Sequence, residues 1–305
     1  MIAAFLPLAV IAGLGALLRH FNPEMEQTRR AINQLVLYVL LPALVFRTVM
    51  ESRLDALFLQ IPAVAAIGVL GCLAIGFVVF HFLPIPGPTK GAMMLGSAFG
   101  NVTYLGLPVL LGIFPGRTEQ VAEVSVLFEI TKSSLNLTLG AMIAIAYGSQ
   151  EPITFRNTLR EALKLPPVWA LAVALAWKAS GVPCPDLVLN AASILAVTVS
   201  GLMMLSLGMA LRFKRPHLMA LALPVAVIKL AISPLIVFAA TGPVGLSGVY
   251  GTAAVLEGAM PSQLLSFIIA GKFRLDEETL AFVIMVDTIL AFVTLPVVRS
   301  LLATG

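Results

Sequence analysis

Two apolar segments, one in each half of the chain, are interrupted by polar and helix-breaking residues at corresponding positions. The first reads GSAFGNVTYLGLPVLL over 96–111, and the second reads AAVLEGAMPSQLLSFII over 253–269. Their prolines, Pro108 and Pro261, are 153 positions apart, about half of the 305 residues. In lipid an unpaired backbone group is costly, so a helix is interrupted only where protein or a water-filled cavity satisfies the chain. A duplicated interruption therefore predicts the binding site of a secondary transporter.

The composition excludes an ordinary soluble domain. The chain is 59% hydrophobic and 11% charged, whereas soluble proteins hold about 25% charged residues. A membrane span needs about 20 apolar residues, and ten segments are expected to cross: 2–19, 31–50, 57–83, 91–114, 121–147, 165–180, 187–211, 217–241, 246–271 and 279–302. The chain is thus predicted to be an all-α polytopic membrane protein.

The positive charges predict the orientation of these spans. Twelve of the 19 Lys and Arg residues fall on one side of the expected spans, and four fall on the other. Because Lys and Arg favour the cytoplasmic side, both termini are predicted to lie outside the cytoplasm, in a multi-pass protein of the inner membrane. These residues occupy short loops, so they indicate topology and not a nucleic-acid surface.

The ten segments divide into two sets of five. Residues 1–148 form the first repeat, 149–164 a cytoplasmic connection, and 165–305 the second repeat. Five is an odd number, so two homologous halves must have opposite orientations, and the interruptions fall in the fourth span of each. This pattern predicts two inverted five-helix repeats.

The first interruption brings polar groups into an apolar segment. Asn101, Thr103 and Tyr104 supply an amide, a hydroxyl and a phenol, and Pro108 loosens the helix. Unwinding frees backbone groups, and the N-terminus of a half-helix carries partial positive charge that attracts anions. The alternative is a kinked helix whose polar side chains bond to neighbouring helices.

The second interruption holds Glu257, Pro261, Ser262 and Gln263. An acid at the membrane centre costs roughly 3 kcal/mol on insertion scales unless it is paired or hydrated. Glu257 can therefore take up a proton and couple transport to protons, or coordinate a cation. Equally, it can be a neutral, hydrogen-bonded residue with a structural role.

Five further polar residues lie inside expected spans. Lys132 and Asp287 follow the two interruptions at nearly the same distance, so the repeat predicts that they face each other, as an ion pair or in a proton relay. Glu129, on the same helical face as Lys132, is a competing partner, and Lys229 is another partner for Asp287. Asn136 either faces the same cavity or bonds to a neighbouring helix. Structural pairing explains these charges as well as a transport role does.

Motifs for other chemistries are absent from the sequence. There is no HExxH, no Walker A loop and no GxSxG elbow, so neither an enzyme, a metal site nor a cofactor is expected. Coupling to H⁺ or Na⁺ stays open. An intramembrane protease needs two acids in a characteristic motif, which Glu257 and Asp287 lack, and mirrored interruptions favour alternating access over a passive channel.

With these features the chain resembles the auxin efflux carrier family, the PIN-like group, in its short bacterial form. The most specific segments are GNVTYLGLPVLLGIF at 100–114 and AMPSQLLSFIIAGKFRLDEETLAFVIMVDTILAFVTLPVV at 259–298. The resemblance implies a fold similar to bile-acid symporters and sodium/proton antiporters, with helices four and nine crossing at Pro108 and Pro261. Asn101 matches the polar residue of the family's first broken helix. A scaffold (about 1–56 and 165–215) would support a mobile transport domain (about 57–148 and 216–305).

The resemblance also implies a function. Family members move organic anions, including auxin in plants and dicarboxylates such as malonate or malate in bacteria. The chain is therefore expected to be a secondary active transporter of small organic anions with an elevator-type mechanism. Its expected partners are the anion and the lipid bilayer, with a homodimer left open. The alternative is a sodium- or proton-coupled symporter or antiporter of another solute, although the paired aspartates of sodium/proton antiporters are missing.

Overall fold

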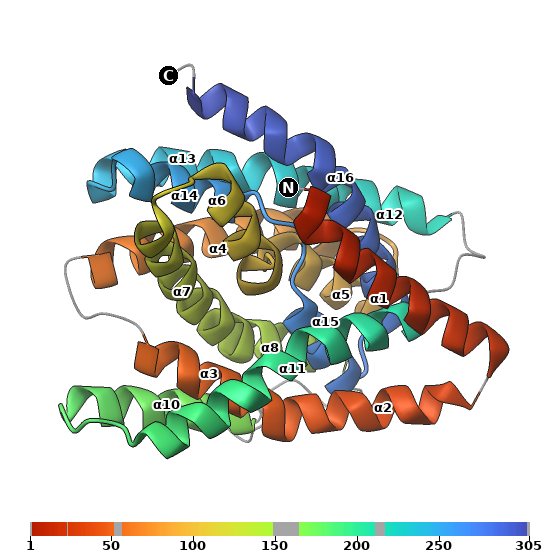
Figure 1. Cartoon of the computed structure of the whole chain (residues 1–305). Helices are drawn as coiled ribbons and strands as arrows, with labels where there is room; N and C mark the ends of the chain where they lie inside the picture. The colour runs from red at the N-terminus through yellow and green to blue at the C-terminus, as the bar shows by residue number, and fades with distance from the viewer. Residues whose placement is uncertain (1, 23, 52–56, 149–164, 211–216, 304–305) are drawn as a thin grey trace.

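The computed structural model describes residues 2–22, 24–51, 57–148, 165–210 and 217–303 (Figure 1). Within these ranges every named element is a helix, so the prediction of an all-helical chain is confirmed. The connection expected at 149–164 lies outside the described residues. The elements labelled η are short π-helical turns that continue an adjoining α-helix, a distortion found mostly as single turns inside α-helices.

All five apolar segments expected in the first half are helical. Their elements are α1 (Ile2–Phe21), α2 (Met25–Leu35), η1 (Val36–Leu40), α3 (Leu41–Glu51), α4 (Leu57–His81), α5 (Gly87–Ala98), η2 (Val102–Gly106), α6 (Leu107–Ile113), α7 (Thr118–Leu135), η3 (Asn136–Gly140) and α8 (Ala141–Gly148). The three π turns in this half lie within the second, fourth and fifth expected segments.

The apolar segments expected in the second half are helical as well. Their elements are α10 (Pro166–Ala179), α11 (Asp186–Ala210), α12 (His217–Ala226), η4 (Val227–Ile232), α13 (Ser233–Val244), α14 (Gly248–Gly258), α15 (Leu264–Lys272) and α16 (Glu277–Ala303). Asp276 begins α16 by accepting the Thr279 N–H at 3.0 Å, as an N-cap residue does.

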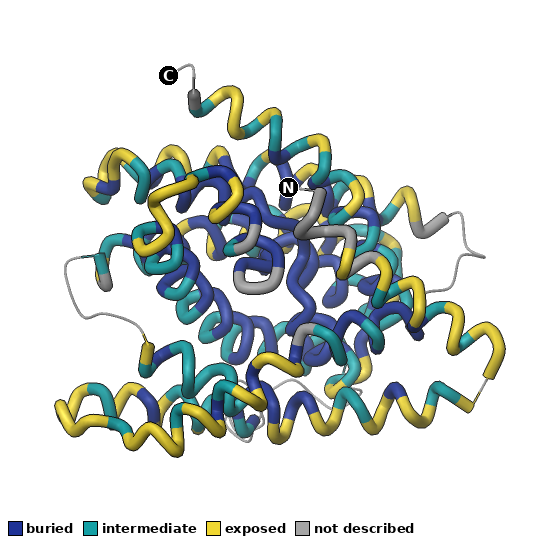
Figure 2. Tube along the Cα trace, viewed as in Figure 1, coloured by how far each residue is buried: buried dark blue, intermediate teal, exposed yellow. Residues whose placement is uncertain are grey.

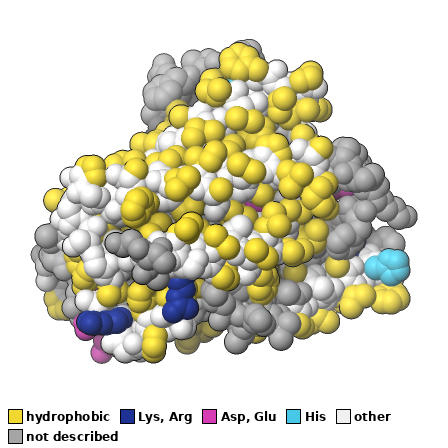
Figure 3. All heavy atoms as spheres, turned by 90° about the horizontal axis from the view of Figure 1, so that it is seen from above, with side chains coloured by type: hydrophobic (Ala, Val, Ile, Leu, Met, Phe, Trp, Pro, Cys, Tyr) yellow, Lys and Arg dark blue, Asp and Glu magenta, His cyan; other side chains and the backbone are white. Residues whose placement is uncertain are grey.

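Five of the helices in the described ranges are long and apolar enough to cross a membrane. They are Met25–Glu51, Leu59–His81, Asp186–Ala210, Met219–Val244 and Glu277–Leu302. Hydrophobic side chains cover much of the face in Figure 3, and Lys and Arg gather near one edge of it. Exposure of so much apolar surface is unfavourable in water but not in lipid. The chain is a multi-pass membrane protein.

The helices pack in two groups (Figure 1). In one group α1 and α2 pack against α11, and α3 packs against both α10 and α11. In the other, α4 contacts α5, α7 and α13, while α16 contacts α5 and α12. Figure 2 shows that the residues buried most deeply lie in the middle of the molecule, among helices of the second group.

Glycines allow α1 and α11 to approach closely. A Cβ atom at Gly208 would overlap the main-chain carbonyl of Ala12, and one at Gly15 would lie 3.0 Å from the Met209 nitrogen. Small residues at such contacts let backbones meet in membrane helix pairs, where van der Waals packing drives association. This contact holds the first helix against the rest of its group.

Candidate functional site

Both expected interruptions are present, and they meet. The chain is non-helical over 99–101, between α5 and η2, and over 259–263, between α14 and α15. The two stretches run side by side, and Gly100 pairs with Ser262 in an isolated antiparallel bridge. The crossing therefore joins residues from the two halves of the chain.

Main-chain hydrogen bonds on both sides of this bridge hold the crossing together. The Asn101 N–H donates to the Pro261 carbonyl at 2.6 Å, and the Gln263 N–H donates to the Phe99 carbonyl at 2.7 Å. A break in a membrane helix leaves such groups without their helical partners, and here each stretch supplies partners for the other. The crossing therefore satisfies these groups without water.

The position of the first break differs from the prediction. Pro108 lies in α6, beyond the crossing, and the chain is helical on both sides of it. The prediction that the helices cross at their prolines is right for Pro261 and wrong for Pro108. The side chains of Thr103, Tyr104 and Pro108, which we expected at the site, lie outside the described residues.

Two buried lysines bond to carbonyl groups at the crossing. Lys132 donates its Nζ hydrogen to the carbonyl of Gly100, and Lys229 donates to the carbonyl of Gly258 at 2.6 Å. Each lysine is 2% exposed. Gly258 is the last residue of α14, so Lys229 stands where the helix dipole is negative. The positive charges therefore stabilise peptide groups that the breaks leave exposed.

Two buried acids each bond to a serine. Ser125 donates to Glu257, and Ser262 contacts Asp287. Both acids are fully buried, and their second oxygens have no hydrogen-bond partner within the described ranges. The Ser262 hydroxyl also lies 2.8 Å from the Gly96 carbonyl. One hydroxyl has a single proton to donate, so both contacts are satisfied together when Asp287 is protonated.

Lys132 and Asp287 were predicted to face each other as an ion pair or in a proton relay, and the structure shows no ion pair between them. Within the described ranges Glu129 also forms no ion pair with Lys132, and Lys229 forms none with Asp287. Instead the lysines reach main-chain carbonyls and Asp287 reaches Ser262. A broken helix leaves carbonyl groups free to accept such bonds, which removes the need for a carboxylate partner. A proton relay through these residues stays a prediction.

A third set of side chains joins α7 and η3 to the second break. Gln263 donates to Glu129 at 3.1 Å, and Asn136 donates to Gln263 at 3.4 Å and to Ser266 at 3.0 Å. Ser133 also donates to Glu129. The sequence allows Asn136 either to face a cavity or to bond to a neighbouring helix, and the structure shows a bond to α15. Nothing in the sequence marks Ser125, Ser133 or Ser266, because isolated serines are common in membrane helices.

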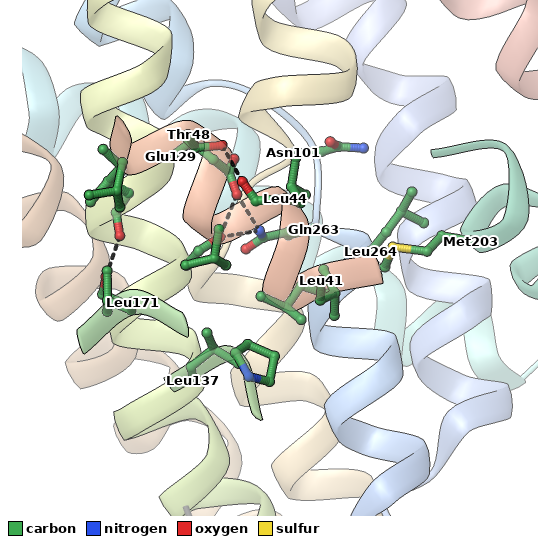
Figure 4. A pocket seen from close by; sticks show the side chains of 17 residues that line it. Leu41, Leu44, Thr48, Asn101, Glu129, Leu137, Leu171, Met203, Gln263 and Leu264 are labelled. Carbon is green, nitrogen blue, oxygen red and sulfur yellow. Dashed lines mark hydrogen bonds between the residues drawn. The ribbon is translucent and has the colours of Figure 1, made fainter. Parts of the chain in front are cut away.

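A narrow pocket opens beside these side chains. Asn101, Glu129 and Gln263 form its polar wall, and leucines of α3, α10 and α15 form much of the rest (Figure 4). In Figure 4 the Asn101 amide points away from the Glu129–Gln263 pair. No described side chain bonds to this amide, which leaves it available to a ligand.

The whole chain matches a known family. The family model described as "Membrane transport protein" covers residues 1–299. The chain belongs to the auxin efflux carrier family. The resemblance carried by the segments at 100–114 and 259–298 is thus confirmed. Membership of this family of transport proteins identifies the chain as a transporter and not an enzyme.

Members of the auxin efflux carrier family from other organisms align along nearly all of this chain. A transporter of Methanothermobacter thermautotrophicus is 28% identical over 300 residues, which is 95% of each chain. Transporter MJ1031 of Methanocaldococcus jannaschii is 21% identical over 92% of this chain and 91% of its own length. Transporter YfdV of Escherichia coli K12 is 24% identical over 91% of this chain and 90% of its own. The similarity thus includes both interrupted segments and both helix groups.

Proposed function

We propose that this carrier is a secondary active transporter of small organic anions, either auxin-like monocarboxylates or dicarboxylates such as malonate or malate. The observation that carries the proposal is the antiparallel crossing at Gly100 and Ser262, which opens on a pocket lined by Asn101, whose amide bonds to no described side chain. Interrupted membrane helices that meet at a cavity are the usual binding site of secondary transporters.

The proposed architecture has ten membrane spans in two inverted five-helix repeats. Both termini lie outside the cytoplasm, in the inner membrane. The two helix groups support a division into scaffold (about 1–56 and 165–215) and transport domain (about 57–148 and 216–305). The pocket supports an elevator mechanism because α3, α10 and α11 line it from one group, and α7 and α15 line it from the other. A substrate bound there would move with the second group.

The proposed anion site is centred on Asn101. Its amide can donate to a carboxylate, and the first-turn N–H groups of α15, whose Leu264 and Leu265 line the pocket, add partial positive charge. Thr103 and Tyr104 belong to the proposed site by their place in the sequence. Gln263 is already bonded to Glu129 and Asn136, so it holds the wall of the pocket in place.

Glu129 favours proton coupling within this proposal. Its carboxylate lines the same pocket as Asn101 and is 7% exposed. An ionised acid there would repel a carboxylate ligand across a medium of low dielectric constant. A proton carried into the pocket with the anion would reduce this repulsion, so we expect anion transport to be coupled to protons. Glu257 and Asp287, whose second oxygens have no hydrogen-bond partner within the described ranges, are further carboxyl groups that can hold a proton in the same region.

The test is transport of radiolabelled malonate and indole-3-acetate into proteoliposomes. Asn101→Ala removes one hydrogen bond to a charged group, worth about 1.5–3 kcal/mol, so KM should rise about 10- to 100-fold. Asn190→Ala, an exposed asparagine on α11, is the matched control and should transport normally. An unchanged KM in Asn101→Ala would remove this amide from the site.

The coupling of transport to protons is tested separately. With Glu129→Gln, transport should lose its dependence on an inward proton gradient while still saturating with substrate. Replacing sodium by potassium at constant pH should leave transport by the wild-type protein unchanged. Sodium dependence would favour the alternative of a sodium-coupled symporter, and a proton-gradient response that survives Glu129→Gln would assign coupling to another group.

A further inference from the structure

A second pocket lies at the other end of α15 from the crossing. It has a volume of about 560 Å³ and lies between α2–η1 and the turn that joins α15 to α16. Arg30, Lys272 and Arg274 line it, together with the polar side chains of Asn33 and Tyr38. Three cationic side chains converge there on a space large enough for a small organic molecule.

The same two helical segments line both pockets. Leu264 and Leu265 at the start of α15 line the pocket at the crossing, whereas Ile268 and Gly271 line the basic pocket. The nine residues of α15 span about 14 Å at 1.5 Å per residue. The second segment, Met25–Glu51, lines the basic pocket with α2 and the crossing pocket with α3. The two pockets are therefore neighbours along one interface between the helix groups.

Arg274 has a backbone conformation that favours glycine. Its φ is 61°, and the Leu275 N–H bonds to the Ala270 carbonyl at 2.9 Å, as in a Schellman turn at a helix end. The left-handed position of this turn is usually glycine, because a Cβ atom is strained there. Such strain is commonly found at functional sites. Arginine at this position therefore costs the protein some backbone stability, but it places a cation at the pocket.

One acid, Glu277, lines the basic pocket beside its three cationic side chains, and it bonds to Arg29. Glu26 bonds to Arg19 and Arg29 and, at 3.5 Å, to Arg30. Lys272 is positioned by Tyr38, whose hydroxyl accepts its hydrogen at 2.6 Å. No described residue bonds to the Arg274 guanidinium. The pocket therefore keeps excess positive charge and unoccupied donors.

Asn33 adds a neutral donor to this set. Its side-chain oxygen accepts a hydrogen bond from Ser206, so its amide hydrogens remain for a ligand. Guanidinium groups and amides together suit a ligand with several acidic oxygens, since arginine binds carboxylate and phosphate through two parallel hydrogen bonds.

We propose that this basic pocket is a second binding site, for soluble anions with two or more acidic oxygens, such as dicarboxylates or phosphate. The inference rests on the proposed anion transport, in which the pocket is the cytoplasmic vestibule that concentrates the anion before it reaches the crossing. Arg274 is its principal ligand, and Lys272 and Arg30 supply further charge.

The experiment measures equilibrium binding of malonate and of inorganic phosphate to the full-length protein in nanodiscs of zwitterionic lipid. Arg274→Gly should weaken binding of both anions at least fivefold while leaving the unfolding temperature unchanged or raising it, because the backbone strain is relieved. Arg274→Lys, which keeps one charge and the strain, should bind with intermediate affinity. Arg117→Gly, at an exposed arginine of negative φ before α7, is the control and should bind normally.

Several results would overturn the proposal. If Arg274→Gly bound both anions with wild-type affinity, Arg274 would not be a ligand of the pocket. If the same variant had a lower unfolding temperature, the backbone at Arg274 would not be strained. Loss of phosphate binding in nanodiscs that contain phosphatidylglycerol would identify a lipid headgroup as the occupant. Phosphate binding that survives Asn101→Ala would support a separate site. The binding assay does not depend on transport. If the wild-type protein failed to carry malonate, the proposed function would be refuted, but the effect of Arg274→Gly on anion binding could still be interpreted.

Discussion

Gly106 lies against the buried carboxylate of Glu257, and a methyl group added there should destabilise the crossing. A Cβ atom at Gly106 would overlap Oε2 of Glu257 and would lie 2.7 Å from its Cδ and 2.9 Å from its Oε1. Glu257 cannot turn toward water because it is fully buried, and its Oε1 is bonded to Ser125. The carboxylate must therefore shift within a packed interior.

Gly112 gives a matched control in the adjoining helix. Its added Cβ would meet nothing within 4 Å, so Gly112→Ala should gain only about 0.5–1 kcal/mol from reduced backbone entropy. Overpacking a buried site costs about 1–3 kcal/mol. Both variants add the same methyl group to a helical glycine. The difference between their free energies of unfolding therefore measures the cost of the overlap at Gly106.

The assay is thermal unfolding of the purified protein in detergent, followed by intrinsic fluorescence. For a chain of this length about 2 °C corresponds to 1 kcal/mol, so Gly106→Ala should unfold about 2–6 °C below Gly112→Ala. In a Glu257→Ala background, where no carboxylate faces Gly106, this difference should vanish. Equal unfolding temperatures in the first comparison would refute the packing of Glu257 on Gly106. A difference that persists in the second would assign the cost to another contact.

Two further predictions concern the contacts that hold the helix groups. Gly208→Ala should lower the unfolding temperature by several degrees, because its Cβ would overlap a carbonyl of α1. In the control Gly201→Ala, on the same helix, the added Cβ meets nothing within 4 Å, so the unfolding temperature should not fall. Equal effects of the two substitutions would contradict the close approach of α1 and α11. Glu277→Gln should cost about 1–3 kcal/mol because Arg29, with a side chain 6% exposed, loses a partner. Glu51→Gln, which breaks an exposed ion pair, should cost less than about 1 kcal/mol in the same measurement.

The breaks could be predicted from the sequence, but their exact positions could not. Glycine, proline and polar residues mark where an apolar helix is weak, and both marked segments are interrupted. The first break lies at Gly100, where the chain pairs with Ser262 more than 160 positions away. Local preference places it at Pro108 instead. The pairing of two distant extended stretches decides the position, and no local pattern records it.

The partners of the buried charges were harder to predict. Opposite charges in a membrane protein suggest an ion pair, and this reasoning joined Lys132 to Asp287. The structure joins Lys132 to the Gly100 carbonyl and Asp287 to Ser262. A sequence shows charged side chains directly, whereas the carbonyl groups that a break exposes become visible only when its position is known.

The crossing also changes which groups remain for a ligand. The sequence suggests that the broken helices offer their peptide groups to an anion. In the structure the N–H groups of Asn101 and Gln263 bond to carbonyls across the bridge, and Lys132 and Lys229 bond to further carbonyls. The two N–H groups therefore hold the two halves together, and the two lysines satisfy carbonyls within their own halves. Among the described residues, the Asn101 side chain and the first turn of α15 remain at the pocket for a ligand. Substrate selection by the described part of the site should therefore depend on this amide and this helix end, and only slightly on the main-chain groups that form the bridge.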